Sequence, residues 1–511
     1  MEKLESNSSK LKEFIENPRL GLWKMTLPFL IGLTVNSLYM LVDTMFVGKF
    51  VSNSSAALDA MGLIFPLMFI VMGLTFGLGS GATTLIAQYI GAKNKKIADN
   101  IASHTLLIGI ILPIIVVALV LALGENIINL FDNTDEETLK YANDYFNIMA
   151  FGTIFMVLAI FFRSILSGEG ETVLPMKILG VGTILNIILD PIFIIVLGLE
   201  VAGAAIATVI SNGVVAMTFM YFLIFKKVSY VKISFRKDVF RFDFELIRKL
   251  FRLGIPASLS FAIMSVGIFA NNIILNKADE NIAKEINCNQ YSKYECAEIS
   301  YHCTLDPQPY IQNIKNQECY YKKGGVIAGF TAASRLENLI MIPIIALSSS
   351  IVTMIGMFYG AGRHELIRST INYAMKWGIK ISLIFGLIFF VFSDILLSIF
   401  TNDQKVILEG VKFFNIVSFS LPFIAISMIT CRAMQGMNRP NPFLFLTLFR
   451  VIIFAIPMAW IGVEYFNKHT DWVWWAVLLS SIISALAGLF WMYKIMKEDR
   501  KRYISEELPS N

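Results

Sequence analysis

The chain has 511 residues, of which 56% are hydrophobic and 16% are charged, and its mean hydropathy is +0.65. One soluble core cannot bury so much apolar surface, so a soluble protein is excluded and we expect a lipid bilayer around much of the chain. The net charge of +5 follows membrane topology, as described below, so no nucleic-acid partner is expected.

Twelve apolar stretches are long enough to cross the hydrocarbon core of a bilayer, which needs about 20 residues per helix. In chain order they cover residues 24–48, 60–90, 99–123, 141–166, 174–197, 202–225, 252–277, 325–357, 370–396, 408–433, 444–464 and 473–494. Their unbroken apolar character predicts helices, because barrel strands would alternate in character at every residue. The sequence therefore predicts an all-α membrane protein with twelve transmembrane helices. Residues 1–19 are polar, so no cleavable signal peptide is expected.

Basic residues gather on one predicted side of the membrane. They lie in the N-terminal tail, in the loops after the even-numbered spans, such as Lys93, Lys95 and Lys96, and in the C-terminal tail. The acidic run 132–137 falls on the opposite side. Because Lys and Arg are enriched on the inner side, we expect a multi-pass plasma-membrane protein with both termini in the cytoplasm.

The two halves of the chain resemble each other. LWKMTLP at 22–28 matches LFRLGIP at 250–256, and TLIAQYIGAKN at 84–94 matches TMIGMFYGAGR at 353–363. Since each half holds an even number of spans, the repeats are parallel, and they predict two six-helix bundles related by a pseudo-twofold axis along the membrane normal. The predicted parts are a cytoplasmic tail 1–20, a bundle 21–225, a cytoplasmic linker 226–251, a bundle 252–496 and a cytoplasmic tail 497–511.

The second half carries an insert of about 41 residues between its first two spans, inside the polar stretch 278–324. Topology places this stretch outside the cell, where an even number of cysteines predicts two disulfides. A zinc site with His302 and four free thiols are the alternatives, and the lack of a C-x-x-C spacing favours disulfides. The connectivity stays open among Cys288, Cys296, Cys303 and Cys319. Cys431, in the tenth span, is expected to be an inert thiol.

Few acidic residues lie inside the predicted spans. An ionised carboxylate is costly there, so those that remain are usually functional. Asp43 is in the first span and Asp190 in the fifth. Glu337 is in the eighth span, two residues after Arg335, and this pair predicts a structural ion pair.

Each aspartate ends a polar stripe. Spacings of three and then four residues put the stripe members on one helical face, and Pro191 removes a backbone hydrogen bond beside Asp190. The sixth span adds more polar groups, so the predicted pocket lining is Asn36, Tyr39, Thr183, Asn186, Thr208 and Asn212. The alternative is that these polar side chains only hold helices together.

The second half has no such pair, because Asp43 aligns with Asn271 and Asp190 with Ile456. We therefore expect cation coupling, by protonation or Na⁺ binding, at Asp43 and Asp190 in the first bundle. No Walker motif and no metal-spaced histidine cluster occur, so we expect neither an enzyme nor a cofactor or metal beyond the coupling ion. The small residues of GLGSGATT at 77–84 are expected to allow close helix packing.

These motifs resemble the multidrug and toxic compound extrusion (MATE) family over nearly the whole chain. The resemblance rests on Y-x-x-x-D-T-x-F-V-G from Tyr39 to Gly48, G-A-K-N at 91–94, and N-x-x-x-D-P from Asn186 to Pro191. It implies a secondary active multidrug antiporter that exports amphipathic, often cationic drug-like compounds in exchange for H⁺ or Na⁺ by alternating access. A monomer is expected.

Within that family the chain looks like the prokaryotic branch with paired aspartates in the N-terminal lobe. Asp43 and Asp190 match the coupling carboxylates of that branch, and Tyr39, Asn186 and Thr208 match its pocket. Another branch uses acids in spans 7 and 10, where this chain has Met264 and no acid. The cysteine-bearing insert departs from the family pattern. A lipid-linked saccharide flippase of the same superfamily and a membrane receptor that uses the insert remain alternatives.

Overall fold

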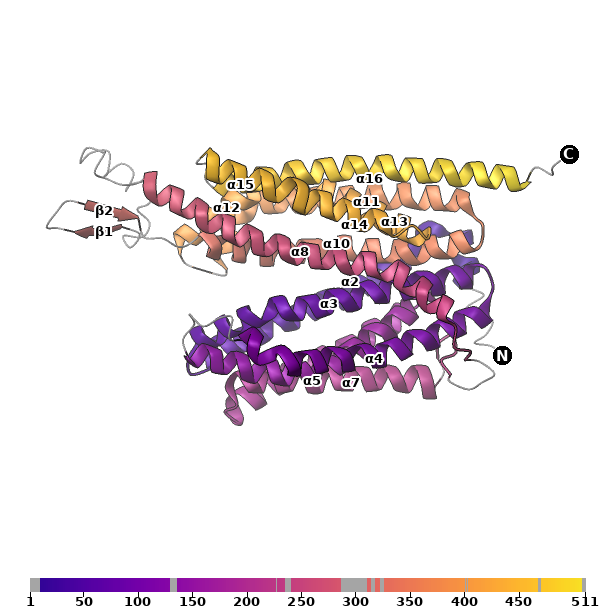
Figure 1. The fold of residues 1–511 in the computed structure, drawn as a ribbon, viewed down its shortest axis with the longest axis horizontal. Helices are drawn as coiled ribbons and strands as arrows, with labels where there is room; N and C mark the ends of the chain where they lie inside the picture. Colours follow the sequence, from indigo (N-terminus) through magenta and orange to yellow (C-terminus); the bar gives the residue numbers. More distant parts are fainter. Residues whose placement is uncertain are drawn as a thin grey trace. The chain divides into compact units, whose positions relative to one another are not determined.

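The computed structural model describes residues 10–128, 136–226, 228–234, 240–285, 310–313, 318–321, 326–399, 401, 403–466 and 470–507. Within these residues, 12 helices are long and apolar enough to cross a membrane (Figure 1). The predicted number and order of the spans are therefore confirmed.

The first half of the chain forms six spans. They are α2 (Pro18–Phe50), α3 (Ser54–Gly91), α4 (Lys95–Ile128), α5 (Glu136–Gly168), α6 (Val173–Pro191) with the π-helix η2 (Ile192–Val196), and α7 (Glu200–Met220) with the π-helix η3 (Tyr221–Phe225). Most helices run a few residues beyond the predicted apolar stretches, because their polar end turns need not lie in hydrocarbon.

The second half repeats this pattern. It contains α8 (Phe244–Glu285), α10 (Val326–Gly360), α11 (His364–Ser398), α12 (Gln404–Val417) joined through the 3-10 turn η5 (Ser418–Ser420) to α13 (Leu421–Gly436), α14 (Asn441–Leu448) joined through the π-helix η6 (Phe449–Ala455) to α15 (Ile456–Tyr465), and α16 (Thr470–Glu507). A π-helix adjoins a proline in both halves, since η2 follows Pro191 and η6 ends two residues before Pro457. Proline cannot make the usual helical hydrogen bond, which favours such local widening.

Packing divides the chain into two compact units. Unit 1 comprises Met1–Ala262, Ile345–Ala374 and Cys431–Leu444, and unit 2 comprises Ile263–Ile344, Met375–Thr430 and Phe445–Asn511. Unit 1 thus holds all six spans of the first half together with parts of α8, α10, α11, α13 and α14. The division by packing differs from the division by sequence repeat because several helices of the second half run through both units.

Small residues let helices of unit 1 pack backbone to backbone. A Cβ added at Gly77 of α3 would lie 2.2 Å from the backbone nitrogen of Ser258 in α8. A Cβ at Gly91 would lie 2.0 Å from the carbonyl oxygen of Met357 in α10, and one at Gly360 would lie 1.9 Å from that of Gln88 in α3. The close packing predicted for the stretch 77–84 is therefore present, and it continues to the end of α3.

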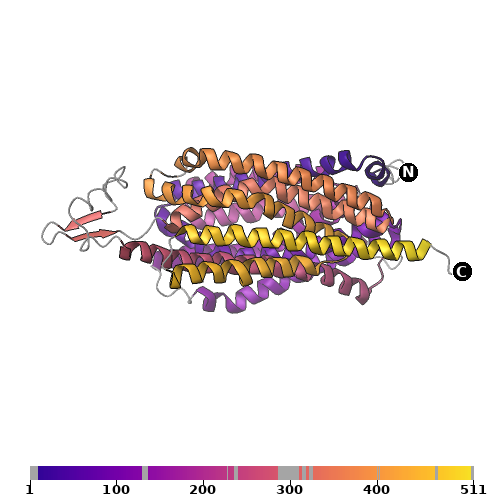
Figure 2. The ribbon, with the colours of Figure 1, turned by 90° about the horizontal axis from the view of Figure 1, so that it is seen from above.

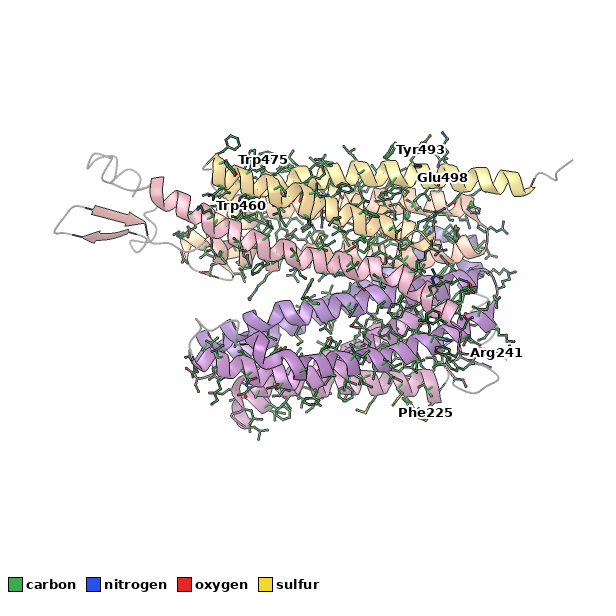
Figure 3. All side chains as sticks on the ribbon, viewed as in Figure 1. Phe225, Arg241, Trp460, Trp475, Tyr493 and Glu498 are labelled. Carbon is green, nitrogen blue, oxygen red and sulfur yellow. The ribbon has the colours of Figure 1, made fainter. Side chains whose placement is uncertain are left out.

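Unit 2 has an aromatic core. The ring of Trp474 stacks on Phe330 at 5.4 Å between centroids and meets the edge of Phe413 at 4.9 Å. Outside this core, Trp475 and Tyr493 of α16 are exposed (Figure 3). Their separation of 18 residues corresponds to about 27 Å of helix, close to the hydrocarbon thickness of about 30 Å. This spacing is typical of the aromatic belts at the two membrane surfaces.

The all-α fold class is confirmed, and the insert adds a short β-hairpin that hydropathy did not predict. Strand β1 (Tyr310–Asn313) pairs antiparallel with β2 (Glu318–Tyr321), and Gln312 is the partner of Cys319. Figures 1 and 2 both place the hairpin beyond the C-terminal end of α8, at the end of unit 2 opposite the last turns of α16. That arrangement agrees with an insert and a C-terminal tail on different sides of the membrane. Cys288, Cys296, His302 and Cys303 lie outside the described residues, so the two disulfides stay a prediction.

Candidate functional site

A cavity lies between α2, α6 and α7 in unit 1. It is partly open to the surroundings, with about 300 Å³ of space when the open part is included, and is lined by Asn36, Leu179, Gly182, Thr183, Asn186, Thr208, Ser211, Asn212 and Val215. The structure thus brings five of the six predicted lining residues to one cavity. The sixth, Tyr39, has a side chain outside the described residues. Gly182 is required here, because a Cβ would lie 2.2 Å from Cγ2 of Val215.

Asp190 lies beside this cavity and is 0% exposed. The amide Nδ2 of Asn186 donates to Asp190 Oδ1 at 3.2 Å and lies 3.5 Å from Thr208 Oγ1. Asn186 therefore fixes one carboxylate oxygen of Asp190 and connects α6 to α7. The spacing of four residues between Asn186 and Asp190 is what places both side chains on the same helical face.

Asp43 of α2 faces the same region. It is 6% exposed, and its carboxylate is near enough to Asp190 for the two negative charges to repel each other. Two carboxylates that share a buried region cannot both remain ionised without a compensating cation. The arrangement thus favours the uptake of at least one positive charge.

Four buried oxygens around the two acids have no hydrogen-bond partner among the described residues. They are Asp43 Oδ1, Asn186 Oδ1, Asp190 Oδ2 and Ser211 Oγ. Leaving a buried polar atom unsatisfied costs about 1–3 kcal/mol, so such atoms are rare in native proteins. Their common position beside one cavity indicates a site that is completed by a proton, a cation or water. Among the described residues, this site included, no group of three or more His, Cys, Asp or Glu side chains that could hold a metal ion occurs.

The comparisons with known proteins identify the family. The sequence profile of the family described as MatE matches residues 28–192 and 324–461, which is more than half of the chain. The chain belongs to the MATE family. It is therefore a multi-pass membrane transporter and not an enzyme.

Individual relatives of this MATE protein match over almost their whole length. A protein of Thermotoga maritima described as probable multidrug resistance protein NorM is 26% identical, over 94% of each chain. The FAD transporter of Shewanella oneidensis is 27% identical, over 92% of this chain and 93% of its own. A solved structure described as an outward-facing multidrug resistance MATE family transporter superposes with a TM-score of 0.81 at 26% identity, covering 94% and 96% of the two chains.

The second half of this MATE protein has no aspartate pair at the corresponding place. Asn271 lies in α8, Ile456 begins α15, and Glu337 in α10 is a partly buried acid of unit 2. Arg450 of η6 supplies the positive charge that acts on Glu337, whereas Arg335 is exposed. The predicted pairing of Glu337 with Arg335 is not what the structure gives, because residues two apart on a helix point in different directions.

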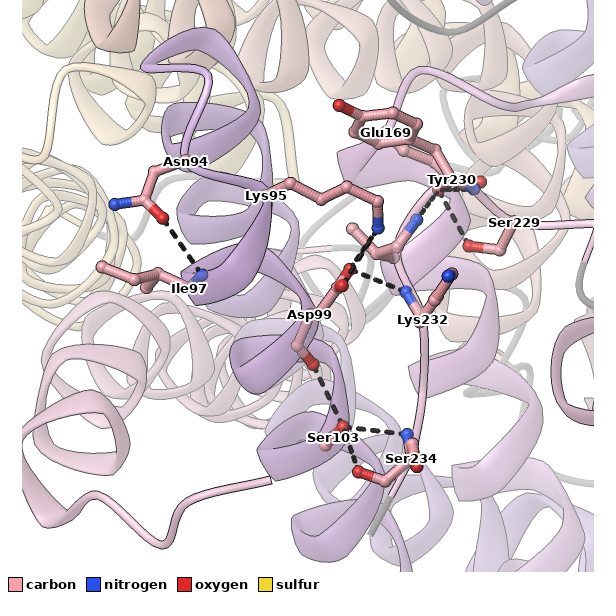
Figure 4. Close-up of polar contacts among 11 residues, drawn as sticks. Asn94, Lys95, Ile97, Asp99, Ser103, Glu169, Ser229, Tyr230, Lys232 and Ser234 are labelled. Atoms are coloured by element: carbon pink, nitrogen blue, oxygen red, sulfur yellow. Dashed lines mark hydrogen bonds and ion pairs between the residues drawn. The ribbon is translucent and has the colours of Figure 1, made fainter. Parts of the chain in front are cut away.

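A further pair of carboxylates, Glu169 and Asp99, anchors the linker between the repeats. The sequence did not reveal it, because Glu169 lies outside the predicted spans and Asp99 is the first residue of one, where an acid can reach water. Glu169, just after α5, accepts hydrogen bonds at Oε2 from Ser229 Oγ and Tyr230 N at 2.8 Å and from Val231 N at 3.1 Å. Asp99 of α4 accepts from Lys232 N at 2.8 Å and from Lys95 Nζ at 2.7 Å (Figure 4).

These contacts attach residues 229–232 to the end of the first bundle. Burial raises the pKa of Glu169 from its ordinary value of 4.5 to about 7, although the three hydrogen bonds and the charge of Lys10 act in the opposite direction. One sequence signal could have revealed this linker contact. The short turn SGEGET at 167–172 follows a span on the side of the basic linker and contains two acids, Glu169 and Glu171.

Proposed function

We propose that this MATE protein is a secondary active antiporter that exports amphipathic, often cationic drug-like compounds in exchange for H⁺ or Na⁺. The proposal places ion coupling at Asp43 and Asp190. Relatives described as a probable multidrug resistance protein and as a multidrug export protein support the substrate class. The family and the lack of a Walker motif in the sequence support transport driven by an ion gradient.

The observation that carries the proposal is the set of four unsatisfied oxygens from α2, α6 and α7. When no cation is bound, at least one carboxylate charge stays uncompensated in a site of low dielectric, and this disfavours tight packing of the three helices. A proton or Na⁺ removes that cost. Ion binding is thereby linked to the shape of the cavity, which is the requirement for coupling ion uptake to drug release.

H⁺ and Na⁺ make different demands on the same atoms. A protonated carboxyl needs only one acceptor near its O–H, whereas Na⁺ needs several oxygens at once. Asp43 Oδ1, Asp190 Oδ2 and Asn186 Oδ1 are all oxygen atoms without a partner among the described residues, so both ions are compatible with the site.

Transport by the reconstituted protein tests the proposed antiport, and the gradient that drives transport identifies H⁺ or Na⁺ as the coupling ion. We expect efflux of a cationic dye such as ethidium from proteoliposomes when either a pH gradient or a Na⁺ gradient is imposed, and we expect no efflux without a gradient. Asp190→Asn should abolish it. Asp394→Asn is the matched control, because Asp394 lies exposed on α11 and belongs to unit 2, whereas all the cavity residues belong to unit 1. Normal gradient-driven efflux by Asp190→Asn would overturn the proposal.

A second candidate substrate class is supported by two arginines of unit 1 that have no ion pair among the described residues. The guanidinium of Arg163 lies 5.5 Å from the ring centre of Phe29 and 5.1 Å from that of Phe76. Arg432 lies 4.9 Å from the ring of Phe443, and its buried Nε has no hydrogen-bond partner there. Cations beside aromatic rings suit a planar aromatic compound with negative charges, and one relative is described as an FAD transporter.

The same proteoliposomes test this alternative. If the second candidate holds, FAD should be transported, and Arg163→Gln or Arg432→Gln should reduce FAD transport more than ethidium transport. If the arginines only stabilise the fold, both substrates should be affected equally.

The orientation in the membrane is also a proposal. The distribution of Lys and Arg supports cytoplasmic termini and an extracellular insert. Protease added to right-side-out vesicles should then cleave within residues 286–309 and leave both tails intact.

A further inference from the structure

The ends of α3 and α10 that meet in unit 1 are closed by direct backbone contact. Gly91 and Gly360 face Met357 and Gln88 of the opposite helix, respectively, with no room for a Cβ at either position. The side chain of Gln88 also donates to the carbonyl oxygen of Gly436 at 2.8 Å. No substrate can pass between helices whose backbones touch. We call this contact the α3–α10 crossing.

The N-terminal segment 10–24 packs against residues at this crossing. Residues 10–16 form a short helix before α2, whose first turns are residues 18–24, and this short helix buries two apolar side chains, with Leu11 8% and Phe14 3% exposed. The Phe14 ring fills the space above two glycines, since a Cβ at Gly21 would lie 2.6 Å from Phe14 Cδ1 and one at Gly170 would lie 2.9 Å from Phe14 Cε2.

Gly170 connects Phe14 to the crossing itself. Its φ of +79° is a left-handed conformation that favours glycine, and the sulfur-bound methyl of Met357 lies 3.5 Å from the same Cβ position. Met357 is the residue whose carbonyl oxygen contacts Gly91. Phe14, Gly170 and Met357 therefore form one apolar contact directly beside the crossing.

Polar contacts hold the segment on both sides of the crossing. Lys10 forms an ion pair with Glu171 at 2.5 Å, in the turn that follows α5 of the first repeat. Trp23 Nε1 donates to the hydroxyl of Tyr373 at 3.1 Å, and the Arg19 guanidinium lies 5.5 Å from the centre of the Tyr373 ring, on α11 of the second repeat. An additional ion pair joins Lys24 to Glu13 within the segment. The segment thus bridges elements that come from both repeats.

We propose that residues 10–24 form a latch that stabilises the closed α3–α10 crossing and must loosen before the crossing opens. The inference rests on the proposed antiport, because alternating access requires this end of the transporter to open once in each cycle. Phe14 supplies the apolar plug of the latch, and the Lys10–Glu171 pair supplies its attachment to the first repeat. Loosening either contact shifts the population toward the open crossing.

Hydrogen–deuterium exchange of the full-length protein in lipid nanodiscs tests the latch without a transport assay. We expect Phe14→Ala and Lys10→Glu to raise amide exchange at least threefold in peptides covering residues 84–93 and 352–362. The charge reversal Lys10→Glu combined with Glu171→Lys should restore slow exchange. Lys12→Ala is the matched control in the same helix, because the Lys12 side chain is 75% exposed.

A different exchange pattern would refute the latch. If Phe14→Ala speeds exchange in residues 10–24 while the two crossing peptides stay protected, the segment only covers apolar surface and the latch is refuted. Should Phe14→Ala fail to fold, Lys10→Glu and its double charge reversal provide the same test. A failed latch would leave antiport intact, and a protein that transports no drug could still show latch-dependent exchange, so the two failures are distinguishable.

Discussion

The two sequence repeats are alike at the α3–α10 crossing and different at the aspartate pocket. Close to the crossing, Gly168 of α5 and Gly436 of α13 occupy matching positions. A Cβ added at Gly168 would lie 2.9 Å from Ile86 Cβ, and one added at Gly436 would lie 3.0 Å from Ile355 Cβ. The pocket shows no such symmetry, because Asp43 and Asp190 correspond to Asn271 and Ile456.

This difference separates two physical requirements. Backbone contact between helices depends only on small residues at the right spacing, and both repeats must meet it for the helices to cross. A charge inside a membrane is costly, and a second pair would add that cost again without adding a new coupling step. One repeat therefore carries the aspartate pair, while both repeats carry the glycines.

The largest effect is expected from side chains placed in the crossing. Gly91→Val and Gly360→Val each force branched carbons toward a carbonyl oxygen, and overpacking typically costs about 1–3 kcal/mol or more. Both variants should lose most of their folded yield in detergent, as measured by size-exclusion chromatography and Tm. Gly180→Val is the control, since no atom lies within 4 Å of a Cβ at Gly180. A strong effect in only one of the two variants would show that the two repeats are not alike at the α3–α10 crossing.

A smaller effect is expected at the charged pair of unit 2. Glu337→Gln removes the negative charge that interacts with Arg450, and Arg450→Gln removes the positive charge that acts on Glu337, so each should lower Tm by several degrees. The double substitution should lower Tm by less than the sum of the two. Strictly additive values would show that the two side chains do not interact. Either way, gradient-driven transport by folded Glu337→Gln should persist.

The smallest effect is expected from Glu169, as a pH dependence. Its folded pKa of about 7 exceeds the ordinary value of 4.5, so the folded state retains the proton where the unfolded chain has lost it. This contribution to stability is complete below pH 4.5 and is lost as pH rises through 7. The Tm should therefore fall by about 2 °C more between pH 5.5 and 8 in the wild type than in Glu169→Gln. Equal slopes would mean that the Glu169 carboxyl titrates normally.

The sequence predicted most of the fold because hydropathy and repeat offsets are properties of the chain itself. It also predicted that Asn36, Thr183 and Thr208 would share a cavity with Asn186, since helical spacing places them on inward faces. Partners far apart in sequence could not be found in this way. Arg450 approaches Glu337 from another helix, and Glu169 meets the linker some 60 residues later. The hairpin lies in a polar insert, where hydropathy gives no signal.

The π-helices were only half predictable. Pro191 indicated an interrupted hydrogen-bond pattern beside Asp190, but not that η2 would follow it as a widened helix. The direction in which a helix adjusts around a proline depends on its packing neighbours, which the local sequence does not specify.

The central claim is that ion coupling belongs to the first repeat alone. Gradient-driven dye efflux should be compared among Asp43→Asn, Asp190→Asn and Glu337→Gln in proteoliposomes that contain equal amounts of folded protein. We expect both aspartate variants to lose efflux while Glu337→Gln retains it, because the unsatisfied oxygens beside the cavity include one from each aspartate and none from Glu337. Normal efflux by both aspartate variants, together with a folded but inactive Glu337→Gln, would place coupling in the second repeat and contradict the account.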